Sequence, residues 1–259
     1  MPSATLPASY AFEDVFIRYS KLALTHIGDR PVAISGLTKR LERFYNSKIT
    51  YGIVHRYLHK SLLWQRSGER GMNGIYHIDT MVIPSWSWLA VQGEIRYNIS
   101  HLRGVSWNRD IEVVLDPHTT HHKRYVLQAP LRLLRDSCIE HSQETNFQLR
   151  GGNQNLVGWM RFDQDNETDI ARLGCIAVGE QKYAHHHDWA LFGEDVNAWK
   201  QYAEVKLCSS LDHSSYHYVL LVKRVLNGTE FSKEQYCRLG VGVILDAWLT
   251  KPQQTVWII

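Results

Sequence analysis

The sequence predicts an α+β fold, with short N-terminal helices packed on a mainly antiparallel β barrel or sandwich. Apolar residues recur at helical spacing in residues 1–82, whereas residues 83–259 hold short β-rich runs separated by polar turns. Serial strands without intervening helices favour antiparallel sheets. At 259 residues, 44% of them hydrophobic and 21% charged, the chain can bury a sizeable core, and we expect one compact domain over residues 1–259.

Three short helices are expected in the N-terminal part. Residues 12–21 carry an apolar stripe at helical spacing. A second helix begins at Asp29, which can cap the free amide groups, and Pro31 falls in the first turn, where its missing N–H costs nothing. The third helix is expected over residues 53–65. The apolar side of the second helix consists of Val32, Ile34, Leu37, Leu41 and Phe44.

The rest of the chain is expected to form strands. Candidate strands are residues 85–91, 111–115, 124–134, 156–162, 175–178, 216–225, 239–245 and 255–259. Asn227-Gly228 is typical of a hairpin turn, and one short helix is expected at 194–202. Residues 142–155 and 164–169 are polar and rich in Gly or Asn, which predicts loops.

Two tryptophans open the β-rich part, in the segment Pro84-Ser85-Trp86-Ser87-Trp88. Residues i and i+2 of a strand share a face. We therefore expect Trp86 and Trp88 to form one aromatic slab. Such a pair buries a large apolar area, so a structural role is expected beside any role in binding.

Four segments carry a resemblance to a known family. Residues 16–25 (FIRYSKLALT), 29–38 (DRPVAISGLT), 52–64 (GIVHRYLHKSLLW) and 84–93 (PSWSWLAVQG) resemble, in order and spacing, the region that follows the HET domain in fungal heterokaryon-incompatibility (HET) domain proteins. That family reads roughly YS..LT...DRLPALSGLA, then Y..GLW...L...LLW, then PSWSWASVDG. Weaker likenesses follow at residues 158–163, 218–223 and 238–243.

The chain differs from the HET family pattern at several positions, and these differences lead to further predictions. The HET domain proper, associated in such proteins with cell death on nonself contact, has no counterpart ahead of residue 16, and we expect the protein to act without it. Val54 stands where the family has Trp, Leu89-Ala90 where it has Ala-Ser, and Gln92 where it has Asp. A fold that loses the tryptophan volume at Val54 either collapses around it or keeps a pocket.

Candidate catalytic residues are His55, His59 and Tyr19, as donors that could polarise a carbonyl. His55 and His59 are spaced i, i+4 on the third expected helix and so project to one face. The alternative for the two histidines is a polar helix face. Candidate substrate-binding residues are Val54, Trp64, Trp86 and Trp88. The 9 Trp, 13 Tyr and 7 Phe suit an aromatic-lined pocket, but a large β core would also contain them.

Composition and charge exclude several partners. The net charge of +3 is mild and the basic residues are scattered, so no nucleic acid is expected. No run approaches the roughly 18 apolar residues of a spanning helix, so no membrane partner is expected. Residues 1–7 have neither the basic start nor the apolar stretch of a secretory signal, and a cytoplasmic location is expected.

No metal and no cofactor are expected. His55 and His59 lack further ligands, and three consecutive histidines, residues 185–187, cannot all face one point. The acidic run from Asp163 imitates a calcium loop, but Thr168 and Gly174 stand where the turn glycine and bidentate glutamate belong. The sequence has no CxxC pair, phosphate-cradling glycine loop, dinucleotide fingerprint or nucleophile elbow.

Two hypotheses of function result. The first is a cofactor-independent cyclase or isomerase, including a pericyclase or dehydratase, that holds a small apolar molecule in an aromatic-lined pocket in fungal secondary metabolism. There, holding the reactive conformer supplies most of the acceleration. The alternative is a non-enzymatic recognition or regulatory module related to heterokaryon incompatibility.

Overall fold

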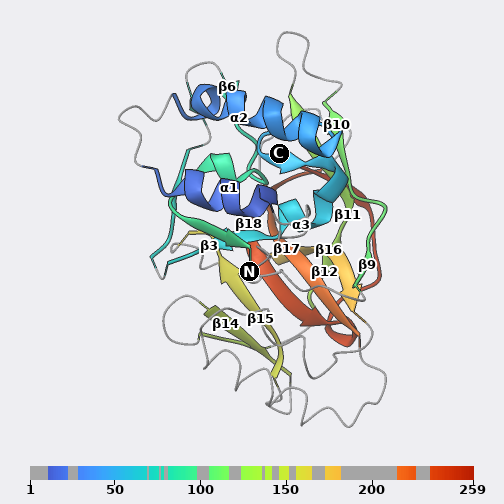
Figure 1. Cartoon of the computed structure of the whole chain (residues 1–259). Coiled ribbons are helices and arrows are strands. Elements are labelled where there is room, and N and C mark those ends of the chain that lie inside the picture. The colour runs from blue at the N-terminus through green and yellow to red at the C-terminus, as the bar shows by residue number, and fades with distance from the viewer. Residues whose placement is uncertain are drawn as a thin grey trace, which may run out of the picture.

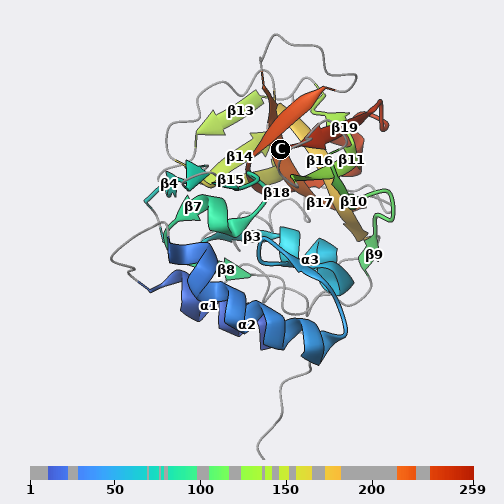
Figure 2. The same cartoon turned by 90° about the horizontal axis from the view of Figure 1, so that it is seen from above.

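The structure, a computed structural model, describes residues 11–22, 29–68, 70–75, 77–78, 81–97, 105–116, 124–135, 138–141, 146–151, 156–164, 173–181, 215–225 and 234–259. Within these residues the helices gather at one end of the molecule and the strands of a large sheet at the other (Figure 1). A view from above shows α1 (Ala11–Ser20) and α2 (Arg30–Tyr45) side by side on the outside, with α3 (Leu58–Leu62) between them and the sheet (Figure 2). The predicted α+β class is confirmed.

The first two helices form close to where the spacing of apolar residues predicts them. Helix α1 spans Ala11–Ser20 and α2 spans Arg30–Tyr45, with Pro31 in its first turn. The predicted cap is wrong in detail, because the Asp29 side chain makes no capping hydrogen bond. At the other end Asn46 adopts the left-handed conformation, and its backbone N–H donates to the last turn of α2.

The third predicted helix, residues 53–65, is wrong in extent. Tyr51 and Gly52 both have positive φ, which makes a tight hairpin of β1 (Ile49–Thr50) and β2 (Ile53–Val54). A 3₁₀ turn, η3 (His55–Tyr57), and a short α3 (Leu58–Leu62) follow, and β3 (Trp64–Arg66) starts at once. His55 therefore lies in the 3₁₀ turn and His59 in α3, so their i, i+4 spacing does not lie on one continuous α-helix.

Short strand pairs complete the N-terminal part, which in the structure comprises the described residues up to Tyr97. Beside β1–β2, the antiparallel pairs are β3 with β8 (Ile95–Tyr97), β4 (Asn73–Gly74) with β7 (Val91–Gln92), and β5 (His77–Ile78) with β6 (Met81–Val82). The predicted strand over residues 85–91 is wrong. Ser85 and Trp86 lie in a turn, and η4 (Trp88–Ala90) is a 3₁₀ helix that the Ser87 hydroxyl caps by accepting the Leu89 N–H.

Eleven strands of the described chain form the large sheet. They are β9 (Val105–Trp107), β10 (Glu112–Leu115), β11 (Tyr125–Pro130), β12 (Arg132–Leu133), β13 (Cys138–His141), β14 (Asn146–Arg150), β15 (Leu156–Phe162), β16 (Leu173–Gln181), β17 (Tyr216–Arg224), β18 (Gln235–Leu245) and β19 (Thr255–Ile258). Strand β18 is central, since it pairs with β15, β17 and β19. Every pair is antiparallel except β18–β19.

The sheet is strongly curled. Strands β11 and β12 are successive stretches of one segment, and they pair with β19 and β16, respectively. Two branches of the sheet leave β18, one through β19 to β11 and one through β17 and β16 to β12, and they meet again on this segment, but only through the covalent chain at Leu131. No continuous ladder closes a barrel among the described strands.

Strand prediction succeeded where apolar runs are long. It failed at the turn-forming residues 85–91 and at the largely polar β14. Seven of the predicted segments coincide with or overlap observed strands, namely β10, β11 with β12, β15, β16, β17, β18 and β19. The predicted loop over residues 142–155 is wrong, because residues 146–150 form β14, whose side chains are largely polar. The helix at 194–202 and the turn at Asn227-Gly228 lie outside the described residues.

One continuous apolar core joins both parts of the molecule. It includes Phe12 from α1, Leu62 from α3, Trp88 from η4, Val219 from β17 and Ile258 from β19. The small hairpins of the N-terminal part thus share their interior with the large sheet. That shared interior positions the pocket described below.

Candidate functional site

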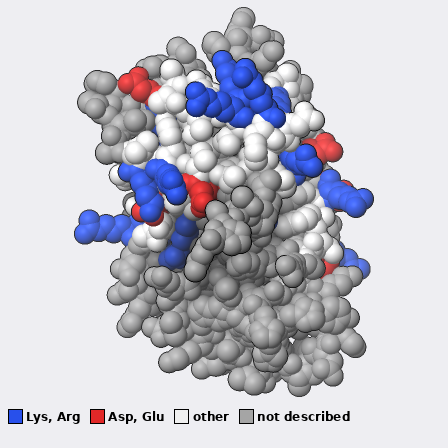
Figure 3. All heavy atoms as spheres, in the orientation of Figure 1, with Lys and Arg blue, Asp and Glu red and all other residues white. Residues whose placement is uncertain are grey.

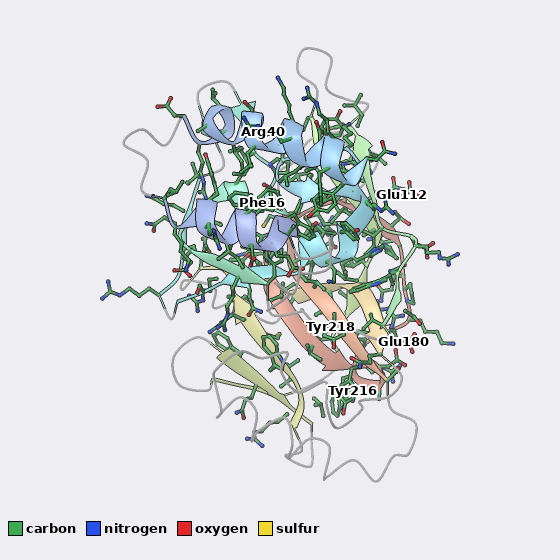
Figure 4. The ribbon with its side chains drawn as sticks, viewed as in Figure 1. Phe16, Arg40, Glu112, Glu180, Tyr216 and Tyr218 are labelled. Carbon is green, nitrogen blue, oxygen red and sulfur yellow. The ribbon has the colours of Figure 1, made fainter. Side chains whose placement is uncertain are left out.

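Trp88 lies at the centre of the N-terminal aromatic core. It has no solvent exposure, and its indole Nε1 donates to the Gly52 carbonyl over 3.1 Å. Phe16 and Tyr19 of α1 contact its ring, at centroid distances of 5.2 and 6.0 Å. A side chain at Gly52, which has φ 75°, would collide with the indole. The hairpin glycine and the tryptophan are therefore fitted to each other. Figure 4 shows Phe16 on α1.

Trp86 and Trp64 are equally buried, but neither forms a slab with Trp88. Both have zero exposure, and the Trp64 indole donates to the Trp86 carbonyl over 3.0 Å. Tyr51 meets Trp86 edge-on at 6.0 Å. The expected slab is wrong because the segment is a turn followed by a 3₁₀ helix, so residues two apart do not share a face.

Val54 is fully buried at the start of η3. Its backbone N–H donates to the Ser61 hydroxyl over 3.2 Å. The pocket described below has neither Val54 nor Trp64, Trp86 or Trp88 in its lining. The predicted substrate-binding residues are therefore core residues in this structure, and a cavity beside Val54 stays a prediction.

The candidate catalytic histidines face different neighbours. His55 Nε2 is 2.8 Å from the Thr50 hydroxyl, whereas His59 Nε2 donates to the Asn108 carbonyl over 2.5 Å. The His59 ring also stacks on Trp107. Burial lowers the pKa of both histidines, with Lys48 adding to the effect at His55 and the Asn108 carbonyl opposing it at His59. Both rings thus make hydrogen bonds within the fold, and burial disfavours their protonated form.

Tyr19, the third candidate, serves the packing of α1 on α2. Its hydroxyl donates to the Arg30 carbonyl over 2.8 Å, and burial raises its pKa. No hydrogen bond or ring contact of the described residues joins Tyr19 to either histidine. The structure does not bring the three candidates together around one point.

A buried ion pair, which the sequence did not reveal, lies where the sheet meets the N-terminal part. Arg238 of β18 donates to both carboxylate oxygens of Asp163, from Nε at 2.8 Å and from Nη2 at 3.3 Å. It also donates to the carbonyls of Leu62 and Trp64, at 2.6 and 2.5 Å, and its guanidinium lies 3.5 Å over the Trp64 ring. We call this arrangement the Arg238 clamp. Burial raises the pKa of Asp163, and the charges of Arg238 and Arg66 oppose that rise.

The clamp is held in turn by Ser85. The Ser85 hydroxyl accepts the Arg238 backbone N–H over 2.9 Å and donates to the Ile259 carbonyl. Backbone hydrogen bonds hold Asp163 in place. Its N–H donates to the Leu239 carbonyl over 2.7 Å, and its carbonyl accepts from the Met72 N–H over 2.8 Å. Both charged side chains therefore sit in a rigid frame.

A pocket of about 420 Å³ opens beside the clamp. Its lining consists of Ser85, Val91, Asp163, Gln164, Lys223, Arg224, Val225, Cys237, Arg238 and Leu239. These residues come from the N-terminal part, the end of β15, the end of β17 and the start of β18. Tyr216, labelled in Figure 4, marks the opposite end of β17. The pocket therefore lies at the junction that the clamp stabilises.

A β-bulge shapes this pocket. In the β17–β18 ladder Leu221 pairs with Gly240 and Val222 with Arg238, which leaves Leu239 as the extra residue. Next along the ladder, Lys223 stands directly opposite Cys237. The bulge adds Leu239 to the lining, and the pocket combines aliphatic side chains with the cations Lys223 and Arg224.

A second surface feature is the outer side of α2. Lys and Arg side chains gather over this helix (Figure 3). Lys39, Arg43 and Lys48 line an open cleft of about 560 Å³ at its C-terminal end. Val32 and Phe44, predicted on the apolar side, are 72% and 64% exposed. They fall outside the buried stripe, which Ile34, Leu41 and Tyr45 form.

Metal binding finds no support among the described residues, where no three His, Cys, Asp or Glu side chains gather closely enough to hold an ion. Residues 185–187 lie outside the described part, and so does most of the acidic run that begins at Asp163. None of the helices that the structure describes has the length and apolar character needed to cross a bilayer.

Comparison with known proteins gave no relative. The chain matches no family model, no curated protein and no solved structure. The site therefore rests on its own geometry. The signal that could have pointed to it is a lone arginine in an otherwise apolar strand, Arg238 in the run QYCRLGVGVIL, because a charge inside such a strand needs a buried partner.

Proposed function

We propose that the protein binds a small, mostly apolar molecule carrying a carbonyl or carboxylate in the pocket beside the Arg238 clamp, and converts it without a cofactor by cyclisation or isomerisation. The lining of the pocket carries this proposal. Its volume of about 420 Å³ lies within the range of about 300–1,000 Å³ typical of ligand pockets. Aliphatic walls suit an apolar body, and a cation at the wall suits one polar group.

The residues of the pocket support a division of tasks. Val91, Val225 and Leu239 supply apolar contact, while Lys223 and Arg224 supply positive charge. Arg224 pairs with Glu234, 2.8 Å away. We assign Lys223 to the ligand because it lines the pocket directly opposite Cys237. A positive charge beside a carbonyl oxygen stabilises the negative charge that develops there during enolisation or ring closure.

Rigidity supports catalysis as well as binding. Arg238 is anchored to Asp163 and to the Leu62 and Trp64 carbonyls, so one wall of the pocket cannot readjust independently. A preformed site holds a flexible substrate in a reactive conformer, and this effect needs no cofactor. We further propose kinship with the region that follows the HET domain in fungal HET-domain proteins, and a role in fungal secondary metabolism.

Two fluorescent probes test the binding step. Anilinonaphthalene sulfonate is apolar and anionic, whereas the naphthalene ketone Prodan is apolar and neutral. Leu239→Trp, which fills the pocket, should weaken both probes at least about 10-fold, and Lys223→Met should weaken only the anionic one. Unchanged affinity of both probes in Leu239→Trp, with the fold intact by circular dichroism, would place the binding site elsewhere.

A second candidate function, non-enzymatic recognition, is favoured by the outer side of α2. Lys39, Arg40 and Arg43 present positive charge there, and Phe44 adds exposed aromatic surface. Such a surface suits an acidic protein partner. Poly-L-glutamate should bind with strong salt dependence and should lose binding in the Arg40→Glu, Arg43→Glu double variant. Equal binding by that variant would remove this candidate.

A further inference from the structure

We propose that Cys237 and Lys223 form a nucleophile and acid pair that adds reversibly to an α,β-unsaturated carbonyl compound held in the pocket. This inference rests on the proposed function, because it names the substrate class and the reacting groups of the same site. It goes further in assigning covalent chemistry to two residues.

Cys237 and Lys223 are direct partners in the β17–β18 ladder. Side chains of directly opposed residues lie on one face of the sheet, with Cβ atoms about 4.5–5.5 Å apart. Both residues also line the pocket, and we infer from this that the thiol and the ammonium group reach the same bound ligand. A lysine side chain is long enough to reach either the opposite sulfur or an atom bound to it.

The other described thiol gives an internal contrast. Cys175 of β16 has no solvent exposure, and burial raises its pKa to about 12, so it is inert. Cys237 is only partly buried and opens onto the pocket. A thiolate is the reactive form of cysteine, and a neighbouring lysine ammonium stabilises it. One cysteine is placed for packing and the other for contact with a ligand.

The chemical step balances without any further reactant. The Cys237 thiolate attacks the β-carbon, a C–S bond forms, and the π electrons move to the α-carbon and carbonyl oxygen. Lys223 then gives its proton to the α-carbon. On reversal the proton returns to Lys223, the C–S bond breaks and the double bond forms again. Between the two steps the former double bond is single and can rotate, so the site interconverts E and Z isomers.

The position of the aliphatic residues suits such a substrate. Leu239, the extra residue of the bulge, lies two positions from Cys237, and Val225 lies two positions from Lys223. Both line the same pocket, so the reacting carbon would approach the sulfur from an apolar side. Water is poorly retained on such a side, which protects an enolate-like intermediate from early protonation by solvent.

Dimethyl maleate tests the proposal as an electrophilic probe. Protein and probe are mixed, the adduct is located by peptide mass spectrometry, and conversion to dimethyl fumarate is followed by NMR. We expect an adduct on Cys237 and faster conversion than with an equal concentration of N-acetylcysteine. Cys237→Ser should abolish both signals, and Lys223→Met should slow conversion at least about 10-fold. Cys175→Ala is the matched control and should leave the rate unchanged.

Two results would overturn the proposal. One is conversion no faster than with N-acetylcysteine, and the other is an unchanged rate in Lys223→Met or Cys237→Ser, each folded by circular dichroism. The fluorescent probes separate this failure from failure of the proposed function. If both probes bind in the pocket while dimethyl maleate does not react, the covalent step alone is wrong. If neither probe binds and no adduct forms, both proposals fall.

Discussion

The aromatic core around Trp88 and the pocket beside the Arg238 clamp lie in the same molecule but are built on opposite principles. The core is mainly aromatic and buried, and ring contacts and indole hydrogen bonds hold it together, with the Arg30 guanidinium 5.3 Å from the Trp88 ring centroid. The clamp buries a charged pair and leaves space beside it. In this molecule large aromatic residues therefore identify the packed core, whereas a buried ion pair beside a pocket identifies the candidate site.

Removing the clamp arginine is the strongest test of this contrast. A single partner left in a buried ion pair costs about 3–5 kcal/mol, so Arg238→Met should lower the free energy of unfolding by that amount in urea. Arg224→Met is the matched control, because its pair with Glu234 is exposed and contributes at most about 1 kcal/mol. Equal losses in the two variants would show that burial does not set the clamp apart.

Trp88→Ala sharpens the other side of the comparison. Truncating a fully buried tryptophan costs about 3–5 kcal/mol, through lost transfer energy and the cavity left behind. Probe binding at the pocket should persist wherever the variant is folded. Phe44→Ala, at a residue 64% exposed, should change stability by less than about 0.5 kcal/mol. An unchanged midpoint for Trp88→Ala would contradict the assignment of Trp88 to the core.

The fold was predictable from the sequence where one periodicity dominates. Phe12 and Phe16 recur at helical spacing and both are buried in α1, and the apolar runs of β17 and β18 form long central strands. The turn at Ser87 was not predictable in this way. Its hydroxyl captures the Leu89 N–H and donates to the Tyr51 carbonyl, and such local bonds override an alternating pattern.

The candidate site was less predictable, because its parts are remote in sequence. Arg238 and Asp163 are 75 residues apart, and Ser85 lies 153 residues from Arg238. No spacing rule connects them. The opposition of Lys223 and Cys237 depends on a bulge that shifts the register by one residue, which the sequence does not announce. His55 and His59 were conspicuous in the sequence, yet each makes a hydrogen bond within the fold, to Thr50 and Asn108, respectively.

One ionisable pair within the N-terminal part tests whether that part is purely neutral packing. Burial raises the pKa of Glu13 from 4.5 to about 7, although Lys60, 3.7 Å away, opposes the rise. Between these pH values the folded protein keeps a proton that the unfolded chain has lost. The free energy of unfolding should therefore fall as pH rises from about 4.5 to about 7, and stay level above.

Glu13→Gln should remove that slope and stabilise the protein above pH 7 by up to about 3 kcal/mol. Asp14→Asn, on the exposed side of the same helix, is the control and should keep most of the slope. Urea midpoints at closely spaced pH values measure both. A slope that survives Glu13→Gln would assign the pH dependence to other groups.

Val54→Trp tests whether a ligand pocket lies beside Val54 in the aromatic core or beside the Arg238 clamp. If the tryptophan volume has collapsed, the larger side chain overpacks the core and costs about 1–3 kcal/mol, while both fluorescent probes bind unchanged. If a cavity lies beside Val54, the variant should keep its stability and lose the probes. Thermal melts and probe titrations on the same sample distinguish these outcomes. The second outcome would support the prediction that a pocket lies at Val54, where HET-domain proteins have Trp.

His55→Ala and His59→Ala should have the smallest effects, because each ring makes one hydrogen bond within the fold. Losing such a bond costs about 1 kcal/mol, with slightly more expected for His59, whose ring also stacks on Trp107 at 5.5 Å. Conversion of dimethyl maleate should be unchanged in both variants, since neither histidine lines the pocket. A drop in conversion of 10-fold or more in a stable His59→Ala would place catalysis on α3 and end the contrast between a packed aromatic core and a reactive junction.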